Sequence, residues 1–253
     1  MDIDRILVFA SRAGKLMLQS GGEIYRVEET VCRICKSFGV DDVDAVASPT
    51  SVVLSIVIDG KVHSICKRIR SRKVNLNIVH NINALSRIIS NENLPIEECE
   101  KRLEDLCKDD SYSNFTLIFY SAIATSTFSI LFGGNINTFL CAFIIGALTK
   151  VISIILSKSY LNDFFINGLC GAFISICSIL CLNLGFINEL DKLIAGCIML
   201  LVPGLSLTNS IRDILQGELV SGLTRVAEAT FIGISIAVGT GGILHLCLKA
   251  GGL

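Results

Sequence analysis

Long uncharged, apolar runs fill most of the second half of the chain. Each approaches the roughly 20 residues that a helix needs to cross a bilayer. These runs predict five membrane spans, near 115–133, 136–157, 163–186, 191–210 and 226–248. Gly133-Gly134-Asn135 is expected to form the turn between the first two spans, and Pro203-Gly204 divides the fourth run.

The first half of the chain shows two different periodicities. Apolar residues recur at helical spacing over 4–20 and 24–38, and again over 75–90 and 95–107. Between them lie three Val- and Ile-rich segments typical of strands, 43–47, 52–58 and 62–69. Asp59-Gly60 is a hairpin signal between the last two. The pattern predicts an α+β domain over 1–112, followed over 113–253 by an all-α membrane domain.

Charge separates the same two halves. Residues 1–112 hold 33 of the 45 charged side chains, and the near-neutral balance gives no argument for nucleic acid. The first 20 residues have scattered charges and no long apolar core, so we expect no secretory signal peptide. With its 16 Lys and Arg, the N-terminal domain is predicted to be cytoplasmic, in a plasma-membrane protein whose C-terminus lies outside.

Polar residues gather beside the break in the fourth run. Ionisable groups are costly in hydrocarbon and usually face a cavity, a partner or a solute path. A broken helix at such a place is typical of secondary transporters. The alternative is a cytoplasmic loop with ordinary surface charges. The candidate transport residues are Pro203, Gly204, Asn209, Arg212, Asp213, Glu218, Arg225 and Glu228.

Two further polar clusters lie in the N-terminal domain. Glu23, Tyr25, Arg26 and Glu28 form either a gate or solute-sensing surface, or a solvated helix face with local ion pairs. The second cluster is basic. It could contact anionic lipid head groups or protect an exposed edge strand by charge. Its residues are Lys67, Arg68, Arg70, Arg72 and Lys73.

Several kinds of chemistry find no support in the sequence. Six of the eleven cysteines lie in the apolar half, where cysteine packs as a small hydrophobe. The pair Cys32 and Cys35 has no second pair or nearby histidine, so neither a metal site nor a cofactor is expected. A phosphate-binding Walker loop is absent, and so are a nucleophile elbow and a zinc-protease motif. We therefore expect no enzyme activity.

Three motifs lie at Gly21–Thr30, Ala47–Thr50 and Leu201–Gly204, and the last continues through Asn209, Ile211–Leu215, Gly217-Glu218, Ser221-Gly222, Arg225 and Glu228-Ala229. Together they resemble the threonine/serine exporter family over nearly the whole chain. The resemblance implies secondary export of small carboxylates, namely succinate-like dicarboxylates or threonine and serine. The chain has the length of the two-component form.

A two-component form implies a partner. The resemblance predicts a small membrane protein of four or five spans from the same family, and a homo-oligomer is the other possibility. From the residues alone, Arg212 and Arg225 are the cations available to a solute carboxylate. A different function class also remains open, a non-transporting membrane adaptor whose soluble domain binds a partner.

Overall fold

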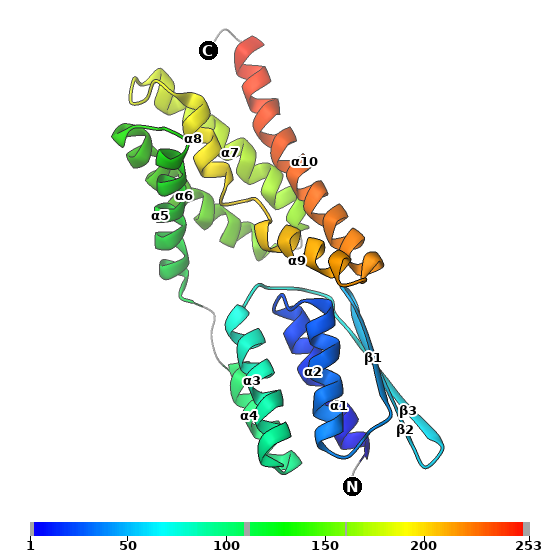
Figure 1. Cartoon of the computed structure of the whole chain (residues 1–253). Coiled ribbons are helices and arrows are strands. Elements are labelled where there is room, and N and C mark those ends of the chain that lie inside the picture. Colours follow the sequence, from blue (N-terminus) through cyan, green and yellow to red (C-terminus); the bar gives the residue numbers. More distant parts are fainter. Residues whose placement is uncertain (1–2, 109–111, 160, 250–253) are drawn as a thin grey trace. The chain divides into compact units, whose positions relative to one another are not determined.

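The computed structural model describes residues 3–108, 112–159 and 161–249, and these form two compact units (Figure 1). The first unit combines Met1–Asp110 with Leu205–Val226, and the second combines Ser111–Gly204 with Ala227–Leu253. The boundary near residue 112 remains a prediction for the protein in a membrane. By packing, however, the polar segment 205–226 belongs with the N-terminal residues, which the sequence did not indicate.

The N-terminal part of the first unit confirms the predicted order of elements. Asp59 and Gly60 both have positive φ, as a two-residue hairpin turn with right-handed twist requires. The three strands form one antiparallel sheet in the order β1-β2-β3. The elements are α1 (Ile3–Gln19), α2 (Ile24–Ser37), β1 (Val43–Ser48), β2 (Ser51–Ile58), β3 (Lys61–Arg68), α3 (Leu76–Glu92) and α4 (Ile96–Lys108).

These elements stack in three layers. Helix α1 packs on β2 and β3, and α2 packs on β1, so the two helices cover one face of the sheet. Helices α3 and α4 pack against α1 on its other side, and α3 also packs against α2 (Figure 1). The core lies between the layers, where Val52, Leu54 and Ile56 of β2 are fully buried. The opposite face of the sheet leaves Val46 and Val62 exposed.

The second unit is helical. It contains α5 (Asn114–Leu131), α6 (Ile136–Ser157), α7 (Asp163–Asn183), α8 (Leu190–Ile198) and most of α10 (Leu219–Lys249). Within the described residues four helices, α5, α6, α7 and α10, are long and apolar enough to cross a membrane. The predicted turn at Gly133 is confirmed, with φ of +90°.

The predicted fourth span is not one continuous helix. The region 191–210 contains the nine-residue α8 and the start of α9 (Gly204–Leu215), separated by residues 199–203. Pro203 explains the break, because it has no N–H for a helical hydrogen bond and its ring excludes helical conformation in the residue before it. Among the residues that the structure describes, four candidate spans are therefore present where the sequence predicted five.

Small residues bring the helices of the second unit close together. Thr125 Oγ1 on α5 donates to the carbonyl of Ala142 on α6 at 2.9 Å. Gly239 on α10 lies against the backbone of Gly168 on α7, where a Cβ would come 2.0 Å from the Gly168 oxygen. Such contacts are typical of helices packed in membranes, where close backbone approach replaces the hydrophobic effect between helices.

Candidate functional site

Helix α9 turns its polar side inward. Asn209, Ser210 and Asp213 are buried, whereas Ile211 and Leu215 are exposed. The helix starts directly after Pro203 and ends at Leu215. Gly217 follows, and its φ of +96° allows the chain to reverse into α10. Polar residues spaced four apart, such as Asn209 and Asp213, lie on one helical face. That face packs on the turn between α1 and α2.

Three hydrogen bonds hold α9 and the first part of α10 to the turn. Asn209 Nδ2 donates to the carbonyl of Gly21 at 2.9 Å. Arg225 Nη2, from the first part of α10, donates to the carbonyl of Gly22 at 3.1 Å. The backbone N–H of Ile24 donates to Asp213 Oδ1 at 3.1 Å. We call this set of contacts the clasp.

The clasp provides a hydrogen-bond acceptor for the first backbone N–H of α2. The first N–H groups of a helix lack intrahelical partners and favour negative charge. Glu23 occupies the N-cap position but makes no side-chain capping bond. Asp213 therefore caps α2 from a distant part of the sequence. Gly22 fits the turn because a Cβ there would come 2.9 Å from the carbonyl oxygen of Met17.

A buried ion pair lies at the centre of the clasp. Asp213 Oδ2 is 3.2 Å from Arg225 Nη1, and Asp213 is 0% exposed. The pKa of Asp213 lies above its ordinary value. Burial is the main cause, and Arg225, the Ile24 N–H and Arg212 offset part of the rise. Because the charges of the pair neutralise each other, Arg225 contributes little free positive charge to a solute.

A second ion-paired group lies on the exposed side of the clasp. The Glu23 side chain is buried and pairs with two guanidinium groups, Arg26 at 2.8 Å and Arg212. The side chains of Arg26 and Arg212 are each about one-third to one-half exposed, at 37% and 50%. Counted by themselves, these three side chains have one guanidinium more than carboxylate. This group, the Glu23 bridge, can accept a further carboxylate through the planar guanidinium forks.

Glu28 connects α2 to the sheet. Its Oε1 accepts the backbone N–H of Ala47 on β1 at 2.7 Å. The pKa of Glu28 lies above its ordinary value. Burial is the main cause, the Ala47 N–H offsets part of the rise, and the nearby carboxylates of Glu218 and Asp213 add to it. Three acidic groups from α2, α9 and the α9–α10 connection thus share one region of the first unit.

The structure does not bring all the candidate residues together. Asn209, Arg212, Asp213 and Arg225 contact the turn or Glu23, and Arg26 also donates to the Tyr25 hydroxyl at 3.3 Å. Pro203, Gly204 and Glu228 belong to the second unit. Sequence reasoning missed the Gly21 and Gly22 carbonyls as acceptors. The spacing of Asn209 and Asp213, with apolar Ile211 and Leu215 on the opposite side, was the signal that could have indicated a buried polar face.

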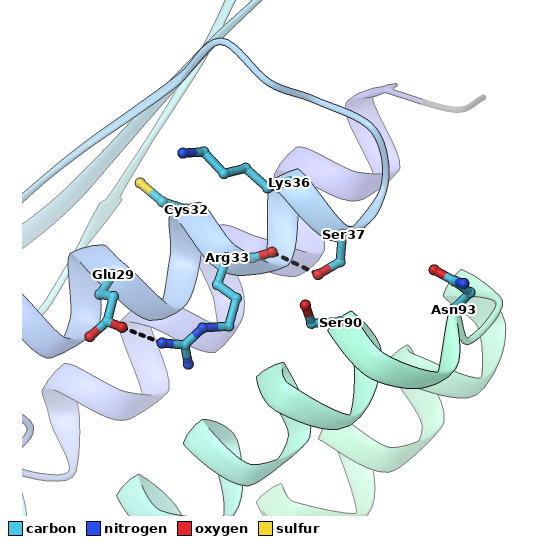
Figure 2. A pocket seen from close by; sticks show the side chains of 7 residues that line it. All are labelled: Glu29, Cys32, Arg33, Lys36, Ser37, Ser90 and Asn93. Carbon is cyan, nitrogen blue, oxygen red and sulfur yellow. Dashed lines mark hydrogen bonds and ion pairs between the residues drawn. The ribbon is translucent and has the colours of Figure 1, made fainter.

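A separate groove lies between α2 and the end of α3 (Figure 2). It has a volume of about 550 Å³ and is lined by Glu29, Cys32, Arg33, Lys36, Ser37, Ser90 and Asn93. Arg33 pairs with Glu29 and donates to Asn83 Oδ1 at 3.4 Å and to Ser86 Oγ at 3.2 Å, so its positive charge is balanced by a carboxylate. The part of the chain that the structure describes holds no cluster of metal-binding side chains. Burial raises the pKa of Cys35 to about 12, so that thiol is unreactive at neutral pH.

Comparison with known proteins adds independent information. A family model described as "Putative threonine/serine exporter" matches residues 8–247. The chain is 25% identical over 88% of its length to the "Probable succinate transporter subunit YjjP" of Klebsiella aerogenes, covering 86% of that protein. The Escherichia coli protein of the same name is 24% identical over 90% of this chain and 89% of its own length.

A longer relative also matches. The "Threonine/serine exporter" of Corynebacterium glutamicum is 26% identical over 97% of this chain, but the match covers only 53% of that protein. The chain thus spans about half of this longer exporter. No solved structure matches the chain.

Proposed function

The chain belongs to the threonine/serine exporter family, and we propose that it exports succinate-like dicarboxylates, or threonine and serine, out of the cell as one subunit of a secondary transporter. That it is a transporter subunit rather than an adaptor follows from the family and from the named relatives. The transported solute, the outward direction, a plasma-membrane location and a cytoplasmic N-terminal domain are parts of the proposal.

One observation carries the proposal. The chain aligns along nearly its full length with proteins named as transporter subunits, and with only 53% of a protein named as an exporter. A second polypeptide would supply a counterpart of the remainder of that exporter. We expect it to be a small membrane protein of four or five spans from the same family, with a homo-oligomer as the alternative.

The Glu23 bridge supports a carboxylate as the solute. Arg26 and Arg212 are half-exposed and share a single buried carboxylate, so a second carboxylate from solution finds unfilled donor capacity. Arg225 has a different role in the proposal, since it is buried and paired with Asp213. It holds α10 to the turn before α2, which positions Arg212 beside Glu23.

Efflux measurements test the proposal. Cells with and without the chain are loaded with succinate, threonine or serine, and the release of each is followed. We expect slower release of at least one solute in cells that lack the chain. Tagged chain purified from native membranes should bring the small membrane protein with it. Unchanged release of all three solutes, with the chain present in the membranes of the control cells, would contradict the proposal.

A further inference from the structure

The first unit exposes an apolar surface where α9 meets α10. Because α9 buries its polar side, its apolar side faces outward, and the first turns of α10 extend the same character. The side chains that form this elbow surface are between 56% and 81% exposed: Ile211, Leu215, Leu219, Val220 and Leu223. Large apolar residues exposed together in one short segment are typical of an interaction site for protein or membrane.

The elbow surface continues into a candidate membrane span. Helix α10 begins at Leu219, within the elbow surface, and runs without a break to Lys249. It is one of the four helices long and apolar enough to cross a membrane. With 31 residues it is longer than the roughly 20 that a span requires, so the helix has residues to spare for turns outside the hydrocarbon.

A basic segment lies at the same end of the first unit. Residues 67–75 contain five Lys and Arg and no Asp or Glu. The chain after β3 is fixed to the end of α1, because Lys73 N donates to Gln19 O at 2.9 Å and Asn75 N to Ser20 O at 3.0 Å. Val74 and Leu205 both lie within 4 Å of the position that a Cβ on Gly21 would occupy. The basic segment and the start of α9 therefore meet at Gly21.

We propose that this end of the first unit rests on the membrane surface. The elbow surface lies at the boundary between head groups and acyl chains, and the basic segment binds anionic lipid head groups. Anionic leaflets attract clusters of Lys and Arg close to a membrane-embedded helix. Protection of an edge strand does not account for the whole segment, because β3 ends at Arg68. Three exposed basic residues follow the strand, namely Arg70, Arg72 and Lys73.

The chain contains no tryptophan, which makes a direct test possible. Single reporters are Ser71→Trp in the basic segment, Leu215→Trp in the elbow surface and Val46→Trp on the exposed face of the sheet. Full-length chain carrying each is reconstituted into vesicles of phosphatidylcholine, with or without phosphatidylglycerol. Quenching by brominated lipid and by aqueous acrylamide is then compared.

We expect Leu215→Trp to be quenched by brominated lipid in both vesicle types, and Val46→Trp only by acrylamide. Ser71→Trp should become several-fold better protected from acrylamide when phosphatidylglycerol is present. That protection should disappear in high salt, which shortens the screening length to about 3 Å at 1 M. It should also disappear in a R68Q/R70Q/K73Q background but remain in the matched K36Q/R87Q/K101Q background, whose charges lie elsewhere on the first unit.

Two results would overturn the inference. If Ser71→Trp and Leu215→Trp are quenched by acrylamide as strongly as Val46→Trp in both vesicle types, neither surface touches lipid. If both reporters become protected only when the partner subunit is added, the surface is a protein interface. Loss of transport in any reporter variant does not affect this readout, so the inference stands or fails separately from the proposed function.

Discussion

The carboxylate of Asp213 on α9 and the guanidinium of Arg225 on α10 form a buried ion pair, with 3.2 Å between Oδ2 and Nη1. Each partner also bonds the turn that connects α1 to α2, Asp213 through the Ile24 N–H and Arg225 through the Gly22 carbonyl. The pair therefore joins three helix ends at one point, and a change at either residue should release all three.

Asp213→Ala is expected to open the clasp. The substitution removes the Asp213 charge from beside buried Arg225 and the acceptor from the Ile24 N–H, which costs about 3–5 kcal/mol. Amide hydrogen exchange of residues 24–27 in the detergent-solubilised chain should accelerate by roughly a hundredfold or more, since about 1.4 kcal/mol corresponds to a factor of ten. Asp44→Ala, at an exposed position on β1, is the control and should leave this exchange unchanged.

A double variant separates charge from packing. Asp213→Leu combined with Arg225→Met removes both charges and should cost less than the sum of the single changes. Strictly additive costs would show that the two side chains act independently, contrary to the geometry.

Glu28 should make stability depend on pH in a defined direction. Burial raises its folded pKa above the ordinary value of 4.5, so the folded state binds the proton more tightly than the unfolded state. The contribution of Glu28 to the free energy of unfolding therefore increases as pH falls from neutral towards 4.5. Below 4.5 this contribution stays constant. The thermal midpoint of the wild type should rise relative to Glu28→Gln over this range.

Glu97 provides a control of opposite sign. Its own backbone N–H and Arg5 lower the pKa of Glu97, so its stabilising effect is present above the ordinary value and is lost as pH falls through the lowered pKa. The thermal midpoint of the wild type should therefore fall relative to Glu97→Gln as pH falls below 4.5. The same trend in both comparisons would contradict the assignment for Glu28.

Arg212 is expected to be required for transport but not for folding. Its side chain is half exposed and contacts Glu23, so Arg212→Ala should reduce efflux at least tenfold while the chain still inserts in the membrane. Arg212→Lys should restore only part of the activity, because lysine keeps the charge but lacks the planar fork. Arg87→Ala, at an exposed position on α3, serves as the matched control. Full activity of Arg212→Ala would remove the Glu23 bridge from the solute path.

Two glycines of α10 should respond differently to alanine. A Cβ on Gly239 would come 2.0 Å from the Gly168 oxygen, whereas a Cβ on Gly241 would meet nothing within 4 Å. Gly239→Ala should separate α7 from α10 and destabilise the second unit by about 1–3 kcal/mol. Gly241→Ala should be neutral or stabilising by up to about 1 kcal/mol, since alanine favours helix. Equal thermal midpoints for the two variants would refute this packing.

The number of membrane crossings can be measured directly. If α8 and the start of α9 together complete a fifth crossing, reporter tags at the two ends of the chain will lie on opposite sides of the membrane. If only α5, α6, α7 and α10 cross, both tags will lie on the same side. The sequence predicts opposite sides, with the C-terminus outside. Residues 250–253 lie outside the described part of the chain, so the side of the membrane on which the C-terminus lies must be measured with the tag.

Local pattern alone determined most of the elements. The helices of the first unit, the Asp59-Gly60 hairpin and four of the apolar spans were all predictable, because each depends on interactions between residues close in sequence. The Pro203 break was also visible in the sequence. The sequence did not show that the break leaves a nine-residue α8 in place of a span. That outcome depends on where the helices on either side of the proline end.

Only the tertiary structure decided what the polar segment contacts. Sequence reasoning treated Gly21–Glu29 and Leu201–Glu228 as separate clusters, and left each open between a functional and an ordinary surface role. The structure joins them, since Asn209, Asp213 and Arg225 bond the backbone of Gly21, Gly22 and Ile24. Backbone carbonyls and N–H groups carry no residue-specific signal, so their pairing with a side chain almost 200 residues away cannot be read from the sequence pattern.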